Sequence, residues 1–141
     1  MQHAHSITLQ VCESDRLSFL PDMFGDDFLS AEMQVYSLAD RYLPQYTGGF
    51  WLFIRLPEGG GYMAPDSDRV HLINADNWFD KTVSGDAAGI VLTALAINRR
   101  CWVHHDRGNA GLVKLLMQRE EQLWNYIETH PERGDIIRAL D

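Results

Sequence analysis

The stretch from Ser84 to Arg100, SGDAAGIVLTALAINRR, carries neither charge nor proline between Asp86 and Arg99. Its apolar residues fall on every side of a 3.6-residue period, which is typical of a helix covered on most faces. Ser84 can accept a hydrogen bond from a first-turn N–H, and Asp86 favours the positive end of the helix dipole. The pattern predicts a buried central helix that ends near Arg99 and Arg100, whose charges suit the last carbonyls.

This helix would contain about 13 residues and measure roughly 20 Å, whereas a bilayer requires ~20 apolar residues. It is therefore expected to lie in a protein core, and no membrane partner is expected. No secretion signal precedes Val11, and two cysteines are too few for a disulfide framework. The cytoplasm is the expected compartment.

Alternating and β-rich stretches predict the strands. Phe50 to Leu56 and Gly61 to Ala64 form a hairpin with a wide glycine-rich loop, and Arg69 to Asn74 is expected to add a third antiparallel strand. Ser6 to Cys12 is a short additional candidate. Residues 75 to 83 lead into the central helix, with Trp78 expected to cover the sheet edge or the start of that helix.

Three further helices follow from apolar periodicity. After a turn of apolar anchors between Leu17 and Phe24, a helix is expected from Asp26 or Asp27 to Tyr42, with Met33 or Leu29 in its apolar face. An amphipathic helix covers 109 to 129, and a short last helix covers 132 to 140. The segment 101 to 109 is expected to be extended.

These elements predict an α+β fold. It is a single compact domain over residues 1–141, in which a small antiparallel sheet of three to four strands packs with about four helices around the buried central helix. Residues 1–5 are expected to form a flexible tail. A monomer is expected.

Charge is unevenly distributed along the chain. The formal net charge is −8, from 12 basic and 20 acidic residues, so general attraction to nucleic acid is not expected and direct DNA binding is disfavoured. Residues 1–50 hold seven acids and two bases, a net of −5, whereas 98–119 hold five bases and one acid, a net of +4. We call residues 98–119 the basic segment. It combines cations with an aromatic residue, so a nucleic-acid-binding module stays open as an alternative, formed by Arg99, Arg100, Trp102 and Arg107.

Catalytic and metal-binding motifs are not recognisable in the sequence. Ser84, Asp86 and His71 could be drawn as a triad, but the first two are already explained as helix-start residues. Cys101, His104, His105 and Asp106 hold ligand-type side chains, yet adjacent histidines on an extended segment point in opposite directions. We therefore predict no catalytic residue, no cofactor and no metal.

Four motifs carry a family resemblance: RLSFLPDMFG, YTGGFWLFIRLPEGGGYMAP, SGDAAGIVLTALAIN and HPERGDIIRALD. In this order they resemble the plasmid antirestriction family of the KlcA and ArdB type, over Arg16 to Asp141. The resemblance implies a single antirestriction domain in a bacterial host cell, which protects incoming plasmid DNA by inhibiting cleavage by type I restriction-modification enzymes. It implies no catalytic residue, and its partner would be the restriction enzyme, met directly or through its DNA complex.

Whole-protein imitation of DNA is disfavoured by a comparison of charge. A globule of this length is roughly 37 Å across, and B-DNA of that length carries about 22 phosphates. All 20 acids gathered on one face would still fall short of that charge. The expected mechanism is therefore non-catalytic recognition through a local polar and aromatic surface.

Eight residues are the candidates for that surface: Arg16, Glu32, Tyr46, Trp51, Ser84, Asp86, Glu132 and Asp141. Several have a competing structural explanation. Ser84 and Asp86 could serve only to start the helix, and Trp51 could belong to the core. Arg16 and Glu32 are predicted to form an ion pair that pins the N-terminal segment, the alternative being two independently solvated charges.

Overall fold

A computed structural model describes residues 8–141 of the chain. The expected tail over residues 1–5 and the first residues of the Ser6–Cys12 strand lie outside this range. The helices and strands are, in chain order, β1 (Leu9–Gln10), α1 (Arg16–Phe24), α2 (Phe28–Tyr42), β2 (Trp51–Arg55), β3 (Gly61–Pro65), β4 (Arg69–Asn74), β5 (Phe79–Ser84), α3 (Gly85–Asp106), α4 (Ala110–Ile127) and α5 (Arg133–Leu140). Short 3₁₀ turns, η1 (Glu13–Asp15), η2 (Gly25–Asp27) and η3 (Ala75–Asn77), join some of them.

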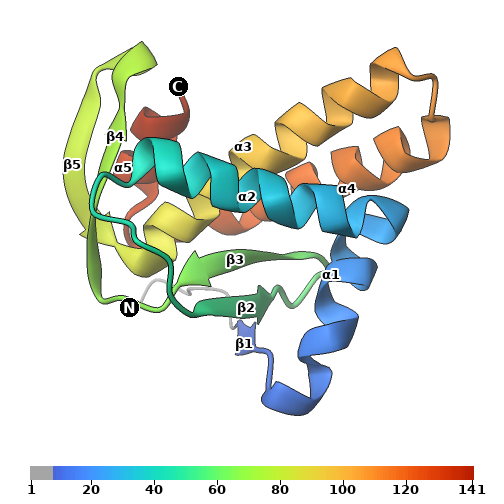
Figure 1. The fold of residues 1–141 in the computed structure, drawn as a ribbon, viewed down its shortest axis with the longest axis horizontal. Coiled ribbons are helices and arrows are strands. Elements are labelled where there is room, and N and C mark those ends of the chain that lie inside the picture. The colour runs from blue at the N-terminus through green and yellow to red at the C-terminus, as the bar shows by residue number, and fades with distance from the viewer. Residues whose placement is uncertain (1–7) are drawn as a thin grey trace.

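Helix α3 is the centre of the molecule, as predicted. It packs against α2, α4, α5 and β3 (Figure 1), and residues 87–97 are buried except for the half-buried Leu95. The helix is longer than predicted, because residues 101–106 are helical and not extended. Nothing in that segment breaks a helix before Gly108, whose φ of 72° ends it, and the buried His104 keeps one side of the segment attached to the core.

Two glycines allow α3 to lie directly on β3. A Cβ at Gly89 would lie 2.3 Å from the carbonyl oxygen of Met63, and one at Gly85 would lie 2.1 Å from that of Ser67. Thr93 then pairs with the free edge of β3, because its Oγ1 accepts from the Met63 N–H at 3.1 Å and donates to the Met63 carbonyl at 3.3 Å. The helix therefore covers the open edge of the sheet and satisfies backbone groups that would otherwise be buried unpaired.

The strands form two small antiparallel sheets and not one. The first has the order β1-β2-β3, with Trp51 opposite Pro65 and Arg55 opposite Gly61, which confirms the predicted hairpin. The expectation that Arg69–Asn74 joins this hairpin is wrong. That strand pairs with β5, from Arg69 opposite Ser84 to Asn74 opposite Phe79, and β5 carries three consecutive exposed residues that conceal its strand pattern.

The N-terminal helices depart from the predicted pattern. Residues 16–24 form a helix and not a turn, because burial of Phe19, Leu20, Met23 and Phe24 along one side compensates for Pro21 inside it. Helix α2 begins next to the predicted start, but Leu29 and Met33 are exposed. Its buried side is formed instead by Ala31, Val35, Leu38, Ala39 and Tyr42, and the helix packs mainly on α3.

Helices α4 and α5 lie where they were predicted, and with them the α+β fold around a buried central helix is confirmed. Arg119, on the polar side of α4, is half buried. Its guanidinium donates to the carbonyl oxygens of Met23 at 2.9 Å and Asp22 at 2.7 Å, and so caps the last turn of α1. Between residues 8 and 141, no helix is long and apolar enough to cross a membrane.

Candidate interaction surfaces

Two neighbouring surface hollows meet at the turn between β3 and β4. One, of about 280 Å³, is lined by the loop after α2, including Tyr46 to Phe50. The other, of about 250 Å³, is lined by Ser84, Gly85 and Asp86. Both share Pro65, Asp66 and Ser67. We call residues 46–50, 65–68 and 84–86 the turn face. It brings together three of the eight candidates, Tyr46, Ser84 and Asp86.

Ser84 links the turn face to the C-terminal segment. Its side-chain oxygen accepts from the Ala87 N–H at 3.0 Å, so Ser84 caps α3 as predicted. The same hydroxyl donates to Glu132 Oε2, and the Ser84 N–H donates to Glu132 Oε1 at 3.0 Å. The carboxylate of Glu132 therefore holds the start of the central helix from a position 48 residues away.

Asp86 is hydrogen-bonded to Tyr62 and His130, two side chains that the sequence analysis did not predict as its partners. The Tyr62 hydroxyl donates to Asp86 Oδ1 at 2.6 Å, and His130 Nε2 lies 2.7 Å from Asp86 Oδ2. Burial, and then the neighbouring Asp86 carboxylate, raise the pKa of Tyr62 above its ordinary range, so the phenol stays a donor. His130 Nδ1 accepts from the Glu132 N–H at 2.9 Å, so Nε2 carries the proton that is shared with Asp86.

These contacts differ from those of a nucleophilic triad. The Ser84 hydroxyl faces a carboxylate, and His130 is bonded to Asp86. His71, the third residue of the triad drawn from sequence, is bonded to Asp80 on β5. The arrangement joins β3, the start of α3 and the α4–α5 connection, and its polar groups are engaged with one another.

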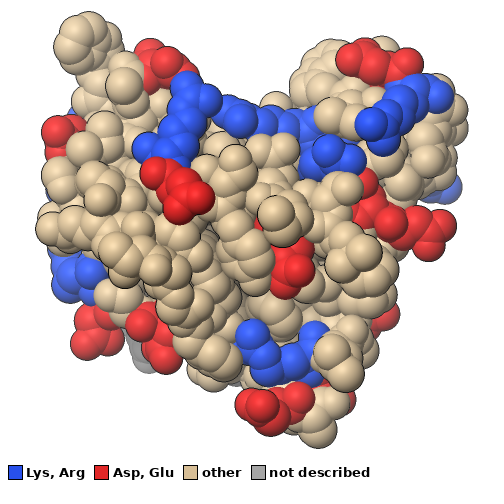
Figure 2. Space-filling view, in the orientation of Figure 1, with Lys and Arg blue, Asp and Glu red and all other residues tan. Residues whose placement is uncertain are grey.

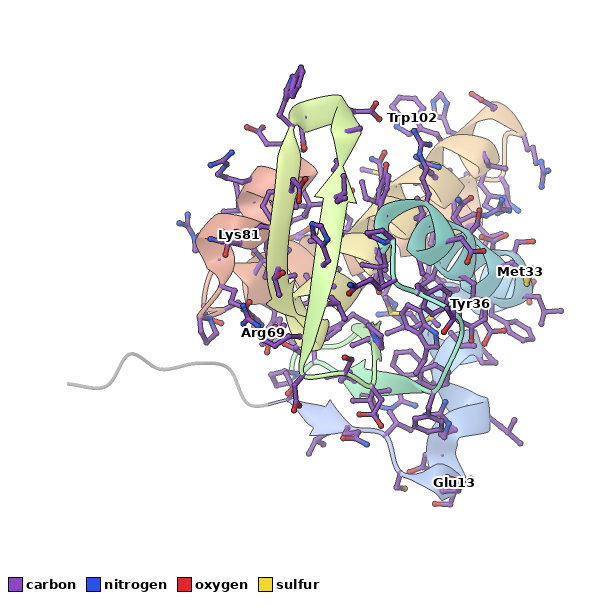
Figure 3. The ribbon with its side chains drawn as sticks, turned by 60° about the vertical axis from the view of Figure 1, so that its left-hand side comes forward. Glu13, Met33, Tyr36, Arg69, Lys81 and Trp102 are labelled. Atoms are coloured by element: carbon purple, nitrogen blue, oxygen red, sulfur yellow. The ribbon has the colours of Figure 1, made fainter. Side chains whose placement is uncertain are left out.

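A cluster of aromatic side chains beside Tyr46 contains Trp51 and contacts Glu32, two more of the candidates. Trp51 Nε1 donates to the Tyr46 hydroxyl at 3.1 Å, and the Trp51 ring lies 5.5 Å from that of Tyr36. The Tyr36 hydroxyl donates to Glu32 at 3.0 Å. Burial, and then Glu32, raise the pKa of Tyr36 above its ordinary range. Trp51 is buried, and Figure 3 shows Tyr36 on α2 beside the loop that follows this helix.

The predicted ion pair between Arg16 and Glu32 is wrong. The Arg16 guanidinium lies over two rings, 4.4 Å from the centroid of Phe50 and 4.2 Å from that of Phe53. Cation–π contact with two rings replaces the expected charge pair, and Glu32 is engaged by Tyr36 instead. Arg16 still pins the N-terminal segment, but it does so to β2 and the residue before it.

Asp141, the last candidate, lies apart from the turn face. It follows α5, is exposed, and donates its N–H to the Ile137 carbonyl at 2.9 Å. The carbonyls of Arg138 and Ala139 accept from Asn77, and that of Ala139 also accepts from Asn74. Asp141 therefore lies at the end of a helix that is tied to the β4–β5 hairpin.

The basic segment contains a buried ion pair that sequence reasoning missed. Arg100 donates to both oxygens of Asp27 at 2.8 Å, and His104 Nε2 lies 2.9 Å from Asp27 Oδ1. Burial acts to raise the pKa of Asp27, but the contacts with Arg100 and His104 outweigh it and hold that pKa below its ordinary value. Arg100 is thus unavailable to a nucleic acid, whereas Trp102 on the same helix is 60% exposed.

Metal-ligand side chains do not converge within the described part of the chain. From residue 8 onward, no group of three or more His, Cys, Asp or Glu side chains is arranged to hold a metal ion. His104 is directed to Asp27, and His105 lies beside Asp106 at 3.6 Å. The sequence offered no signal for Asp27, Tyr62 or His130, because the oppositely charged or hydrogen-bonding side chain that each one meets, Arg100 or Asp86, lies at least 24 residues away in the chain.

Comparison with known proteins gives a consistent family assignment. A family model described as "Antirestriction protein" matches residues 44–141. A protein of Escherichia coli strain K12 named "Putative antirestriction protein YubI" is 61% identical over the full length of both chains. An Escherichia coli protein named "Antirestriction protein KlcA" is 37% identical, with 96% of this chain and 93% of that protein covered.

A solved structure shares the fold. It is 32% identical in sequence, has a TM-score of 0.86, and covers 100% of this chain and 99% of its own. This structure is described as one of the KlcA and ArdB proteins, which show a novel fold and antirestriction activity against type I DNA restriction systems in vivo but not in vitro.

Proposed function

The chain belongs to the antirestriction protein family, and from this premise we propose that it inhibits DNA cleavage by type I restriction-modification enzymes and so protects incoming plasmid DNA. The observation that carries the proposal is the match, over the whole chain, to a structure reported with activity against type I systems in vivo. The proposed mode is non-catalytic, and the proposed site of action is the cytoplasm of a bacterial host.

The distribution of charge favours a mode other than DNA mimicry. Figure 2 shows Asp and Glu in separate small groups with Lys and Arg between them, and a band of Lys and Arg along the notch at the top of this view. Within residues 8–141, five carboxylates are paired with Lys or Arg: Asp22, Asp27, Asp76, Asp135 and Glu128. A continuous row of free negative charge, which an imitation of the DNA backbone needs, is not supported by this pattern.

The turn face is the proposed recognition surface. Thr47 to Gly49 and Asp66 to Asp68 are exposed on it, and the contacts of Ser84 and Asp86 tie its helix-start edge to β3 and to the α4–α5 connection. A mixed surface of loops held by a rigid frame suits protein recognition, because less ordering is required when the partner binds. We propose that the partner is the restriction enzyme, either alone or engaged on DNA.

The test is protection of unmodified phage in cells that carry a type I system. We expect the wild-type chain to raise plating efficiency, and Asp66→Ala with Asp68→Ala to reduce that effect while the thermal unfolding midpoint stays unchanged. Asp40→Ala, an exposed carboxylate on α2, is the matched control and should protect like wild type. The proposed function fails if the wild-type chain gives no protection at a confirmed expression level.

The enzymatic alternative is tested separately. If the mode is non-catalytic, we expect protection to increase with the amount of the chain relative to the restriction enzyme and to saturate near a fixed ratio. Full protection at a much smaller amount of the chain relative to the restriction enzyme would indicate turnover and contradict the proposal.

A further inference from the structure

Trp78 stands at the tip of the β4–β5 hairpin with 90% of its surface exposed. Its backbone is left-handed, with φ 64° and ψ 21°, and it is the only residue other than glycine with a positive φ in the described range. A bulky residue is disfavoured in this conformation, and an exposed indole gains nothing from burial. Glycine or asparagine would fit the turn with less strain, so folding gives no reason for tryptophan here.

Hydrogen bonds fix the backbone of the hairpin tip on both sides of Trp78. Asn74 Oδ1 accepts from the Asp76 N–H and Asn77 Oδ1 accepts from the Phe79 N–H, both at 3.2 Å. The amide groups of Asn74 and Asn77 donate to the Ala139 carbonyl at 2.9 and 2.8 Å. Figure 1 shows the tip beside the end of α5 and projecting beyond the body of the molecule. The backbone that carries the indole is therefore already ordered before a partner binds, which lowers the entropy cost of binding.

The charges beside Trp78 favour a protein partner over a nucleic acid. Asp76 and Asp80, two positions to either side, are 74% and 64% exposed at their side chains. Asp76 lies 3.6 Å from Arg41, and Asp80 is bonded to His71. A base-stacking platform needs a positively charged track along the strand, and here carboxylates flank the aromatic residue.

We infer that Trp78 is a docking anchor that inserts into an apolar pocket of a protein partner whose rim carries basic side chains. This inference rests on the proposed function, which makes the partner the type I restriction enzyme. Tryptophan is enriched among residues that dominate binding energy, where one large ring fills a desolvated pocket. Basic rim residues on the partner would meet Asp76 and Asp80 and set the orientation.

Substitution at the tip separates binding from folding. Trp78→Gly removes the indole and relieves the left-handed strain, so the thermal unfolding midpoint should be unchanged or higher. Protection of unmodified phage should nevertheless fall, with affinity for the enzyme about thirtyfold weaker, as is typical when a hot-spot residue is truncated. Trp78→Phe should retain part of the protection. Trp102→Ala removes another exposed indole, near the C-terminal end of α3, which Figure 1 shows on the opposite side of the molecule from the hairpin tip. This variant is the control and should protect fully.

Crosslinking identifies the partner directly. Trp78→benzoylphenylalanine is expressed in restricting cells and irradiated during phage entry, and a crosslink to a subunit of the restriction enzyme is expected. Full protection by Trp78→Gly, an equal loss in Trp102→Ala, or a crosslink to DNA instead of protein would overturn the inference. Absence of protection by the wild-type chain would instead refute the proposed function, so the two failures are distinguishable.

Discussion

Glu132 binds Ser84 through both carboxylate oxygens: Oε1 accepts from the Ser84 N–H at 3.0 Å, and Oε2 accepts from the Ser84 hydroxyl. The hydroxyl also accepts from the Ala87 N–H at 3.0 Å, so one small side chain caps the central helix and binds the connection before α5. Ser84 therefore has a structural role whether or not it also contacts a partner, and stability measurements give the size of that role.

Ser84→Ala should lower the free energy of unfolding by about 1–2 kcal/mol, since it removes a helix cap and a bond to a carboxylate. In a double-mutant cycle with Glu132→Ala, the coupling should be about 0.5–3 kcal/mol. Urea denaturation of the four proteins measures both quantities. Ser37→Ala, at an exposed position of α2, is the control and should have little effect. Additive losses from Ser84 and Glu132 would show that the contact does not stabilise the fold.

A pair of glycine substitutions tests the packing of α3 on the sheet. Gly89→Ala places a methyl group 2.3 Å from the Met63 carbonyl oxygen, and the resulting displacement should cost about 1–3 kcal/mol or more. Gly134→Ala meets no atom within 4 Å in α5 and should stabilise by up to about 1 kcal/mol, because alanine is the better helix former. Thermal unfolding of both variants gives the comparison. Equal midpoints would contradict the close approach of α3 to β3.

The elements that could be predicted are those with local signals. Helix α3 has caps and an uncharged apolar run, and the β2–β3 hairpin has aromatic strands around glycines. Helix α1 was missed because Pro21 argues against a helix locally, and only burial against α4 and β2 outweighs it. Strand β5 was missed because its register depends on β4, and its exposed centre shows no alternation.

The candidate surfaces were predictable only in part, for the same reason. Ser84 could be recognised as a helix cap from its immediate neighbours, but its bond to Glu132 depends on a tertiary contact. Arg16 could be recognised as a pinning cation, yet the choice between Glu32 and the rings of Phe50 and Phe53 is made by the path of β2. Trp78 was expected to cover the sheet edge or the start of the central helix, but it lies exposed at the tip of the β4–β5 hairpin, a position that depends on the pairing of β4 with β5.

Acidification should weaken the fold through Asp27. Contacts with Arg100 and His104 outweigh the effect of burial and hold the pKa of Asp27 below its ordinary value. A carboxylate with a lowered folded pKa contributes stability that is fully present above its unfolded pKa, about 3.9, and is lost as pH falls through the folded value. The loss should therefore begin near pH 4 and continue below it.

The Asp27→Asn variant isolates this contribution. At neutral pH it should be about 3–5 kcal/mol less stable than wild type, because the largely buried Arg100 loses its partner. The difference between the two proteins should shrink as pH falls below about 4, which denaturation at a series of pH values would measure. A difference that stays constant through this range would show that ionised Asp27 is not the source of the stability.

The double variant Arg99→Ala with Arg107→Ala should leave protection unchanged. Arg100 is held by Asp27 at 2.8 Å, so the basic segment loses one of the cations that a nucleic-acid site would use. Of the three cations assigned to a nucleic-acid-binding module between Arg99 and Arg107, only these two then remain, and two are too few to overcome a net charge of −8. Phage protection in restricting cells, together with DNA binding at several salt concentrations, measures the effect.

The paired lysine variant sharpens this test. If protection fell in the alanine variant but not in Arg99→Lys with Arg107→Lys, positive charge at this segment would be required for function. Binding of DNA by the wild-type chain with a steep salt dependence, lost in the alanine variant, would then favour a nucleic-acid-binding module. Protection that is retained in both variants, with DNA binding absent at low salt, would place recognition on the loop surfaces at the other end of α3.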